Sequence, residues 1–123
     1  MLVSIIIPVF NEERWLEGLV KRVQAVVMPK ELVLVNDGSS DRSAEIMAEL
    51  NRQDPRVKGI SLSRNFGFQV AVTCGLDHAQ GDAVILIDAD LQDPPEVILQ
   101  MIEKWREGYD VAYGVRGERA GET

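Results

Sequence analysis

Residues 2–7 carry the sequence Leu-Val-Ser-Ile-Ile-Ile, an almost unbroken apolar run in which β-branched side chains prevail. A strand with one solvated face would alternate apolar and polar residues. This run does not alternate, so it predicts a β-strand that is buried on both faces. Similar short apolar segments recur at residues 31–35, 57–62, 83–87 and 110–115. Strands buried on both faces are typical of parallel sheets covered by helices, and the run therefore predicts the α/β class.

Segments with helical periodicity separate the predicted strands. They are residues 13–27, 41–52, 68–79 and 94–107. Four strand–helix units followed by a fifth strand predict a mostly parallel sheet with helices on both faces. Trp15 and Trp105 fall at helical spacing with other apolar residues and are expected to pack against the core, and Cys74 is expected to be a small core residue.

The composition narrows the class of partner. The chain has 123 residues, 13 of them Lys or Arg and 20 Asp or Glu, so its formal net charge is −7. That length suits one domain or half of a larger one. The acidic balance argues against nucleic acid as a partner, because nucleic acid requires a positive field.

Cys74 is the only cysteine, which favours a reducing compartment. With no signal peptide and no apolar stretch of about 20 residues, a cytoplasmic location is expected.

The sharpest chemical signal is Asp88-Ala89-Asp90, two carboxylates at the end of a very apolar strand. In parallel sheets, ligands bind outside the carboxyl ends of the strands. Two like charges are costly to bury unless a cation or strong donors neutralise them. Oxygen ligands without His or Cys suit Mg²⁺ or Mn²⁺, and Gln92 adds a neutral oxygen. The alternative is a solvated strand end with turn-forming aspartates.

Residues that suit a nucleoside follow the first two strands. Phe10 can stack on a base, Glu12 can reach a ribose, and Asp37 lies where a carboxylate accepts hydrogen bonds from either. The competing interpretation is local structure: Pro8 ends the strand, Asn11 caps the next helix, and Asp37 belongs to a turn and cap over residues 37–40. No Gly-x-Gly-x-x-Gly motif is present, so the dinucleotide fingerprint is absent.

Arginines follow the third and fifth predicted strands. Arg64 can pair with a phosphate. Arg116 follows the fifth strand, near the place where a diphosphate bound to the cation would lie. An arginine there could stabilise negative charge that develops on the phosphates. For both residues the alternative is an ordinary solvated loop arginine.

Taken together, these motifs resemble family 2 glycosyltransferases of the GT-A fold. More narrowly, they are similar to the dolichol-phosphate mannosyltransferase and bacterial polyprenyl-phosphate glucosyltransferase subgroup. The matching segments are IPVFNEE at 7–13, VNDGSSD at 35–41, LSRNFG at 62–67, DADLQDPPE at 88–96 and GYDVAYGVR at 108–116. One such segment is a weak signal, but five in order, each beside a predicted strand, are specific.

The resemblance implies a metal-dependent, inverting transfer of a hexose from a nucleotide sugar to a polyprenyl or dolichyl phosphate. UDP-glucose is the first expected donor and GDP-mannose the second. The nucleotide sugar would be held by Pro8, Phe10, Glu12, Asp37, Arg64 and Asp88. Mg²⁺ or Mn²⁺ and the diphosphate would be held by Asp88, Asp90 and Gln92, with Asp90 as the nearest ligand. Asp90 and Arg116 are the expected catalytic residues.

Family members are longer than this chain. The resemblance therefore implies that residues 1–123 are the donor-binding half of a Rossmann-like GT-A domain, with the acceptor-binding part and any membrane helices elsewhere. Full-length relatives would act at the cytoplasmic face of the membrane. In the family a later strand inserts beside the fourth, so an exposed sheet edge is expected here, and it could pair with a second copy in a homodimer.

Three other functions stay open. A phosphoacceptor receiver domain fits the length, but it expects an Asp after the third strand and a Lys after the fifth, where this chain has Arg64-Asn65 and Arg116. A phosphohydrolase of the Asp-x-Asp type expects Thr or Val where Gln92 stands. A fragment that binds a nucleotide but transfers no sugar is compatible with every motif.

Overall fold

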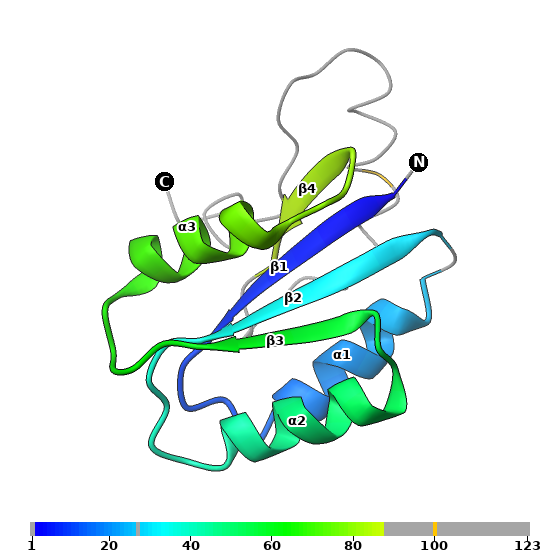
Figure 1. The fold of residues 1–123 in the computed structure, drawn as a ribbon. Helices are drawn as coiled ribbons and strands as arrows, with labels where there is room; N and C mark the ends of the chain where they lie inside the picture. The colour runs from blue at the N-terminus through cyan, green and yellow to red at the C-terminus, as the bar shows by residue number, and fades with distance from the viewer. Residues whose placement is uncertain (1, 27, 88–99, 101–123) are drawn as a thin grey trace, which may run out of the picture.

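The computed structural model describes residues 2–26, 28–87 and 100, and in this part of the chain strands and helices alternate (Figure 1). The elements are β1 (Val3–Val9), α1 (Leu16–Gln24), β2 (Lys30–Asn36), α2 (Ser43–Gln53), β3 (Val57–Ser61), α3 (Phe68–His78) and β4 (Ala83–Leu86). The predicted alternation is confirmed over these elements. Apart from residue 100, the helix predicted over 94–107 and the strand predicted over 110–115 lie outside the described residues.

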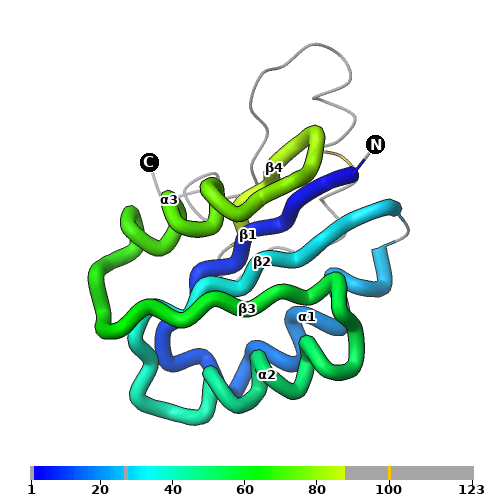
Figure 2. Tube along the Cα trace, in the orientation of Figure 1, coloured from blue at the N-terminus to red at the C-terminus, as the bar shows by residue number. Residues whose placement is uncertain are grey.

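The described strands form one parallel sheet in the order β3-β2-β1-β4. β1 pairs with β2 along its whole length but with β4 only as far as Ile6↔Leu86. Figure 2 shows that the chain leaves β1, β2 and β3 at the same edge of the sheet. The mostly parallel sheet predicted from the apolar runs is confirmed.

Helices cover both faces of this sheet (Figure 1). Ile5 and Ile7 of β1 pack with α1 and α2, whereas Ile6 packs with Ala71 of α3, and all four side chains are fully buried. Successive strand residues face opposite sides, so a central strand with helices on both sides favours apolar residues at every position, unless a polar one has hydrogen-bond partners as Ser4 does. This explains why the run at residues 2–7 shows so little polar alternation.

Pro8 does not end the first strand, contrary to the expectation from sequence. β1 continues to Val9, and Pro8 pairs with Val35 of β2. The Val9 carbonyl oxygen accepts from the Asp37 amide on the β2 side, so the nitrogen of the preceding residue faces the β4 side. Pairing between β1 and β4 ends at Ile6, and the missing amide hydrogen of Pro8 therefore falls beyond the last pair.

Trp15 does not pack against the core either. α1 begins at Leu16, later than predicted, and Trp15 is its 60% exposed N-cap residue. The buried stripe of α1 is centred on Leu16, and each helical residue turns by about 100°, so position 15 points away from it. Cys74 is half-buried, and burial raises the pKa of its thiol. It packs against the apolar cluster between α3 and the sheet, which consists of Ile6, Val33, Val35 and Ala71.

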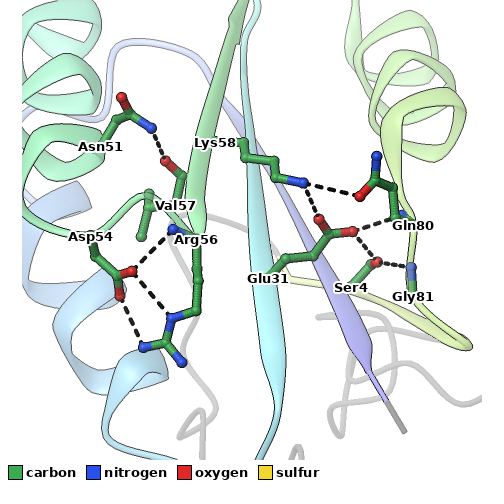
Figure 3. A network of polar contacts seen from close by, with 9 residues as sticks. All are labelled: Ser4, Glu31, Asn51, Asp54, Arg56, Val57, Lys58, Gln80 and Gly81. Carbon is green, nitrogen blue, oxygen red and sulfur yellow. Dashed lines mark hydrogen bonds and ion pairs between the residues drawn. The ribbon is translucent and has the colours of Figure 1, made fainter.

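At the opposite edge of the sheet, where the strands begin, a buried carboxylate joins four segments (Figure 3). Glu31 is 3% exposed, and it accepts from Ser4 Oγ at 2.5 Å, the Gln80 amide at 2.7 Å and Lys58 Nζ at 2.7 Å. Ser4 Oγ accepts in turn from the Gly81 amide at 2.7 Å. Burial alone would raise the pKa of Glu31, but these hydrogen bonds outweigh it and lower the pKa. The network ties the loop before β4 to the other three strands.

Candidate functional site

Three loops meet at the carboxyl edge of the sheet: residues 10–15 after β1, 37–42 after β2 and 62–67 after β3 (Figure 1). They contain the predicted site residues Phe10, Glu12, Asp37 and Arg64, and Pro8 lies just before them in β1. The loops of parallel strands lie side by side at this edge, which is where such sheets bind ligands. The structure thus brings the described part of the predicted site to one edge.

Asp37 is the hub between the second and third loops. Asp37 is 4% exposed, and its carboxylate accepts from the Phe66 amide at 2.8 Å, the Gly67 amide at 3.1 Å and Asn65 Nδ2 at 3.1 Å. Its carbonyl oxygen accepts from the same Asn65 nitrogen at 3.1 Å. One carboxylate therefore holds three consecutive residues of the 62–67 loop, a role that the sequence did not reveal. Contact between Asp37 and a nucleoside stays a prediction.

Gly38 allows the two loops to touch through their backbones. Its φ is +73°, a left-handed conformation, and a Cβ there would lie 2.3 Å from the Arg64 carbonyl carbon and 2.3 Å from the Asn65 nitrogen. No side chain fits at that separation. The chain bends at Gly38, as expected, and the bend is also a contact surface for the next loop. The helix cap expected within residues 38–40 is not there, because α2 begins at Ser43 with Arg42 as its N-cap residue.

Arg64 is presented on the outside of its loop. Its guanidinium carbon lies 4.5 Å from the centroid of the Phe66 ring, a cation–π arrangement. Both side chains are exposed, Phe66 by 42%. Among the residues that the structure describes, Arg64 makes no ion pair. A guanidinium that is oriented at this edge and has no carboxylate partner within the described residues suits an anion, although phosphate binding by Arg64 stays a prediction.

Asn11 braces the first loop against the second. Its Oδ1 accepts from the amides of Ser40 at 2.8 Å and Asp41 at 3.3 Å, while its own amide donates to Ser39 Oγ at 2.9 Å. The sequence suggested that Asn11 caps α1. The structure shows instead that Trp15 is the N-cap residue and that Asn11 bonds to the second loop. Its φ of +54° turns it toward the second loop, and asparagine tolerates that conformation better than most residues.

Two further bonds complete this brace. The Glu12 amide donates to Ser43 Oγ at 3.0 Å and the Glu13 amide to Asp41 Oδ2 at 3.1 Å. Burial tends to raise the pKa of Asp41, but its hydrogen bonds from Ser43 and Glu13 outweigh this and lower it. The backbone of Glu12 is thus fixed, and Phe10 beside it keeps a 46% exposed ring.

The remaining predicted site residues, Asp88, Asp90, Gln92 and Arg116, lie outside the described residues. The chain reaches them from Ile87, which is 1% exposed and donates its amide to the Ile6 carbonyl at 2.9 Å. Within residues 2–26, 28–87 and 100, no group of three His, Cys, Asp or Glu side chains could hold a metal ion. None of α1, α2 and α3, the described helices, has the length and hydropathy needed to cross a bilayer.

Curated relatives match this chain along nearly all of its length. It is 56% identical to "Uncharacterized glycosyltransferase YkcC" of Bacillus subtilis over 98% of the chain and 38% of that protein. It is 46% identical to "Bactoprenol glucosyl transferase" of Shigella phage SfV over 98% of the chain and 40% of that protein. The chain thus spans about two fifths of the length of these relatives.

Solved structures show the same fold. S. aureus TarS 1-349 in complex with UDP superposes with a TM-score of 0.73 at 26% identity, over 87% of this chain and 32% of that one. The mannosyltransferase PcManGT from Pyrobaculum calidifontis in complex with GDP-Man and Mn²⁺ gives 0.71 at 25% identity, over 84% and 31%. The GT-A architecture expected from the motifs is confirmed.

The family assignment follows from the sequence match itself. The family model described as "Glycosyl transferase family 2" matches residues 4–123, which includes all five motifs. This match overturns the receiver and phosphohydrolase interpretations, because the chain is assigned to a family of glycosyltransferases. The chain belongs to glycosyl transferase family 2.

Proposed function

We propose that this chain is the donor-binding part of an enzyme that transfers a hexose from a nucleotide sugar to a polyprenyl phosphate. The observation that carries the proposal is the set of three loops braced to one another at the carboxyl edge. They carry an exposed Phe10 and an Arg64 that pairs with no carboxylate of the described residues. A site whose backbone is already ordered loses little entropy when it binds a ligand. UDP-glucose is the first expected donor and GDP-mannose the second.

The described loops would hold the nucleoside end of the donor. Phe10 would stack on the base, and Glu12 would accept hydrogen bonds from the ribose hydroxyls. Pro8 and Asp37 lie at the ends of the two central strands and would form the floor of the same pocket. Arg64, with its planar fork of donors, would contact the diphosphate.

The diphosphate end would depend on a divalent cation. Asp88, Asp90 and Gln92 supply only oxygen ligands, and this donor set fits Mg²⁺ or Mn²⁺. A cation held by these residues would supply positive charge against the negative charge that grows on the leaving nucleoside diphosphate. The mannosyltransferase of similar fold contains Mn²⁺ together with GDP-Man, which supports the assignment. Arg116 would add positive charge beside the phosphates.

The acceptor chemistry makes few demands on this chain. A phosphate monoester has a second pKa of about 6 and is largely dianionic at neutral pH, so it attacks without much help from a general base. The phage relative is named for bactoprenol, which supports a polyprenyl phosphate as acceptor. The acceptor-binding part and any membrane helices would lie outside residues 1–123, and the full enzyme would act at the cytoplasmic face of the membrane.

A second candidate is a chain that binds the donor but transfers no sugar. It is favoured by the fact that the chain spans only 38% of its Bacillus subtilis relative. Incubation of the purified chain with UDP-glucose and polyprenyl phosphate distinguishes the two candidates. Little or no glucosyl lipid is expected, and robust transfer would show that residues 1–123 are a complete enzyme.

A thermal-shift screen tests donor binding. The chain is heated with UDP, GDP, UDP-glucose or GDP-mannose, each with and without Mn²⁺. We expect the uridine compounds to raise the unfolding temperature more than the guanosine compounds, and only when Mn²⁺ is present. Equal unfolding temperatures under all conditions would contradict the proposal.

A further inference from the structure

Asn65 makes two contacts that the proposed donor site has not used so far. Its Nδ2 donates to the Asp37 carbonyl oxygen and to Asp37 Oδ2, each at 3.1 Å. The first bond anchors the loop after β3 to the end of β2, and the second fixes the rotation of the carboxylate. Asn65 is itself exposed, so it fills no part of the core.

The residues on both sides of Asn65 are fixed by the same anchor. The backbone amide of Phe66 donates to Asp37 Oδ1 at 2.8 Å, so Asp37 also holds the backbone that carries the ring on which Arg64 lies. On the other side, the Arg64 carbonyl carbon lies against Gly38. The backbone that carries Arg64 is therefore set by two supports, the Gly38 contact and the hydrogen bonds to Asp37.

The Arg64 guanidinium is oriented, and no carboxylate in the described part of the chain neutralises it. The Arg64 guanidinium stacks 4.5 Å from the Phe66 ring centroid and pairs with no carboxylate among the described residues. A guanidinium that is already oriented loses less side-chain entropy when it forms two hydrogen bonds to a phosphate. The position of this group should therefore control affinity for the phosphate part of a ligand.

We propose that Asn65 is a positioning residue for the nucleotide diphosphate, which it affects through Arg64 and not by contact with the ligand. This inference rests on the proposed function, because it takes the ligand to be a nucleoside diphosphate. Asn65 has to be a hydrogen-bond donor. An aspartate in its place would set a second carboxylate beside Asp37, with no hydrogen to donate to either oxygen.

Calorimetric titration of the 123-residue chain with UDP in the presence of Mn²⁺ tests the inference. Asn65→Ala should weaken binding about tenfold, which corresponds to about 1.4 kcal/mol, the size of one or two lost hydrogen bonds. Asn65→Asp should weaken it further. Because Asn65 acts through Arg64, the double variant Arg64→Ala/Asn65→Ala should bind within about twofold of Arg64→Ala alone.

Asn51→Ala is the matched control. Asn51 also donates its side-chain amide to a backbone oxygen, that of Val57 at 2.7 Å, but at the edge where β3 begins (Figure 3). This variant should unfold at a lower temperature and bind UDP normally. Two results would overturn this inference and leave the proposed function standing. One is a double variant whose loss of UDP affinity equals the product of the losses in Arg64→Ala and Asn65→Ala, and the other is normal UDP binding by Asn65→Ala. A lack of UDP binding by the unsubstituted chain would overturn the proposed function and this inference with it.

Discussion

Asp37, Asn11 and Glu31 show how single polar residues organise this molecule. Each is an acceptor that joins segments far apart in sequence; the donors to the Asp37 carboxylate, for example, lie 28 to 30 residues further along the chain. Local spacing indicated that Asp37 and Phe10 lie at the ligand edge, and the structure places them there. It could not indicate which donors Asp37 meets, because those depend on how β2 and β3 are paired.

Glu31 gives a pH-dependent prediction at the residue scale. Glutamine at this position would present an amino group to at least one of three donors, so Glu31→Gln should lose about 1–2 kcal/mol of unfolding free energy at pH 7. The folded-state pKa of Glu31 lies below its unfolded value, so its contribution is present above the unfolded value and disappears as the pH falls through the folded value. Urea unfolding at pH 7 and near pH 4 should show the difference between the two proteins shrinking in acid.

Glu49→Gln provides the control for this comparison. Glu49 pairs with Arg52 on the exposed surface of α2, where ion pairs contribute little to stability. This variant should unfold like the unsubstituted chain at both pH values. A Glu31→Gln protein as stable as the original at pH 7 would contradict the structural role given to the network.

At the scale of elements, the sequence predicted strands better than helix starts. The strands are recognisable because their apolar runs are local and strong. α1 begins three residues and α2 two residues later than predicted, and there is a physical reason. None of the N-cap residues Trp15, Arg42 and Gly67 makes a side-chain capping bond, so the usual signal is missing from the sequence.

Gly75 supports a prediction about how α3 packs on the sheet. A Cβ at Gly75 would lie 2.5 Å from Ile6 Cγ2, so the helix approaches β1 closely because this residue is glycine. Gly75→Ala should lower the unfolding free energy by about 1–2 kcal/mol, because overpacking outweighs the better helix propensity of alanine.

The matched substitution is Gly18→Ala in α1. Outside the backbone of α1 itself and the two neighbouring residues, no atom of the described part of the chain lies within 4 Å of a Cβ at Gly18, so alanine should stabilise the chain by about 0.5–1 kcal/mol. Denaturant melts of both variants give the two values. If Gly75→Ala stabilises the protein as Gly18→Ala does, that result would contradict the close approach of α3 to Ile6.

At the scale of the whole molecule, the order β3-β2-β1-β4 leaves β4 at one end of the described sheet, with Val84 on it 38% exposed. Among the described strands β4 pairs only with β1, and a strand with an open edge favours association with another chain. We therefore expect the chain to dimerise through β4, and Val84→Lys to shift light-scattering masses toward the monomer. Val70→Lys, a change at another exposed valine, should leave the mass unchanged. A monomeric chain at high concentration would exclude the dimer.

The central claim is that the carboxyl edge binds a nucleoside diphosphate together with a divalent cation held by Asp88, Asp90 and Gln92. Calorimetric titration of UDP into the chain, with and without Mn²⁺, tests it most directly when Asp90→Asn is compared with the unsubstituted chain and with Asp93→Asn. Asp93 is a suitable control because the sequence predicts that it caps the following helix and is not a metal ligand. The account predicts that Mn²⁺ strengthens UDP binding in the unsubstituted chain and in Asp93→Asn, and that Asp90→Asn loses this gain while it remains folded. Unchanged Mn²⁺-dependent affinity in Asp90→Asn would contradict the account.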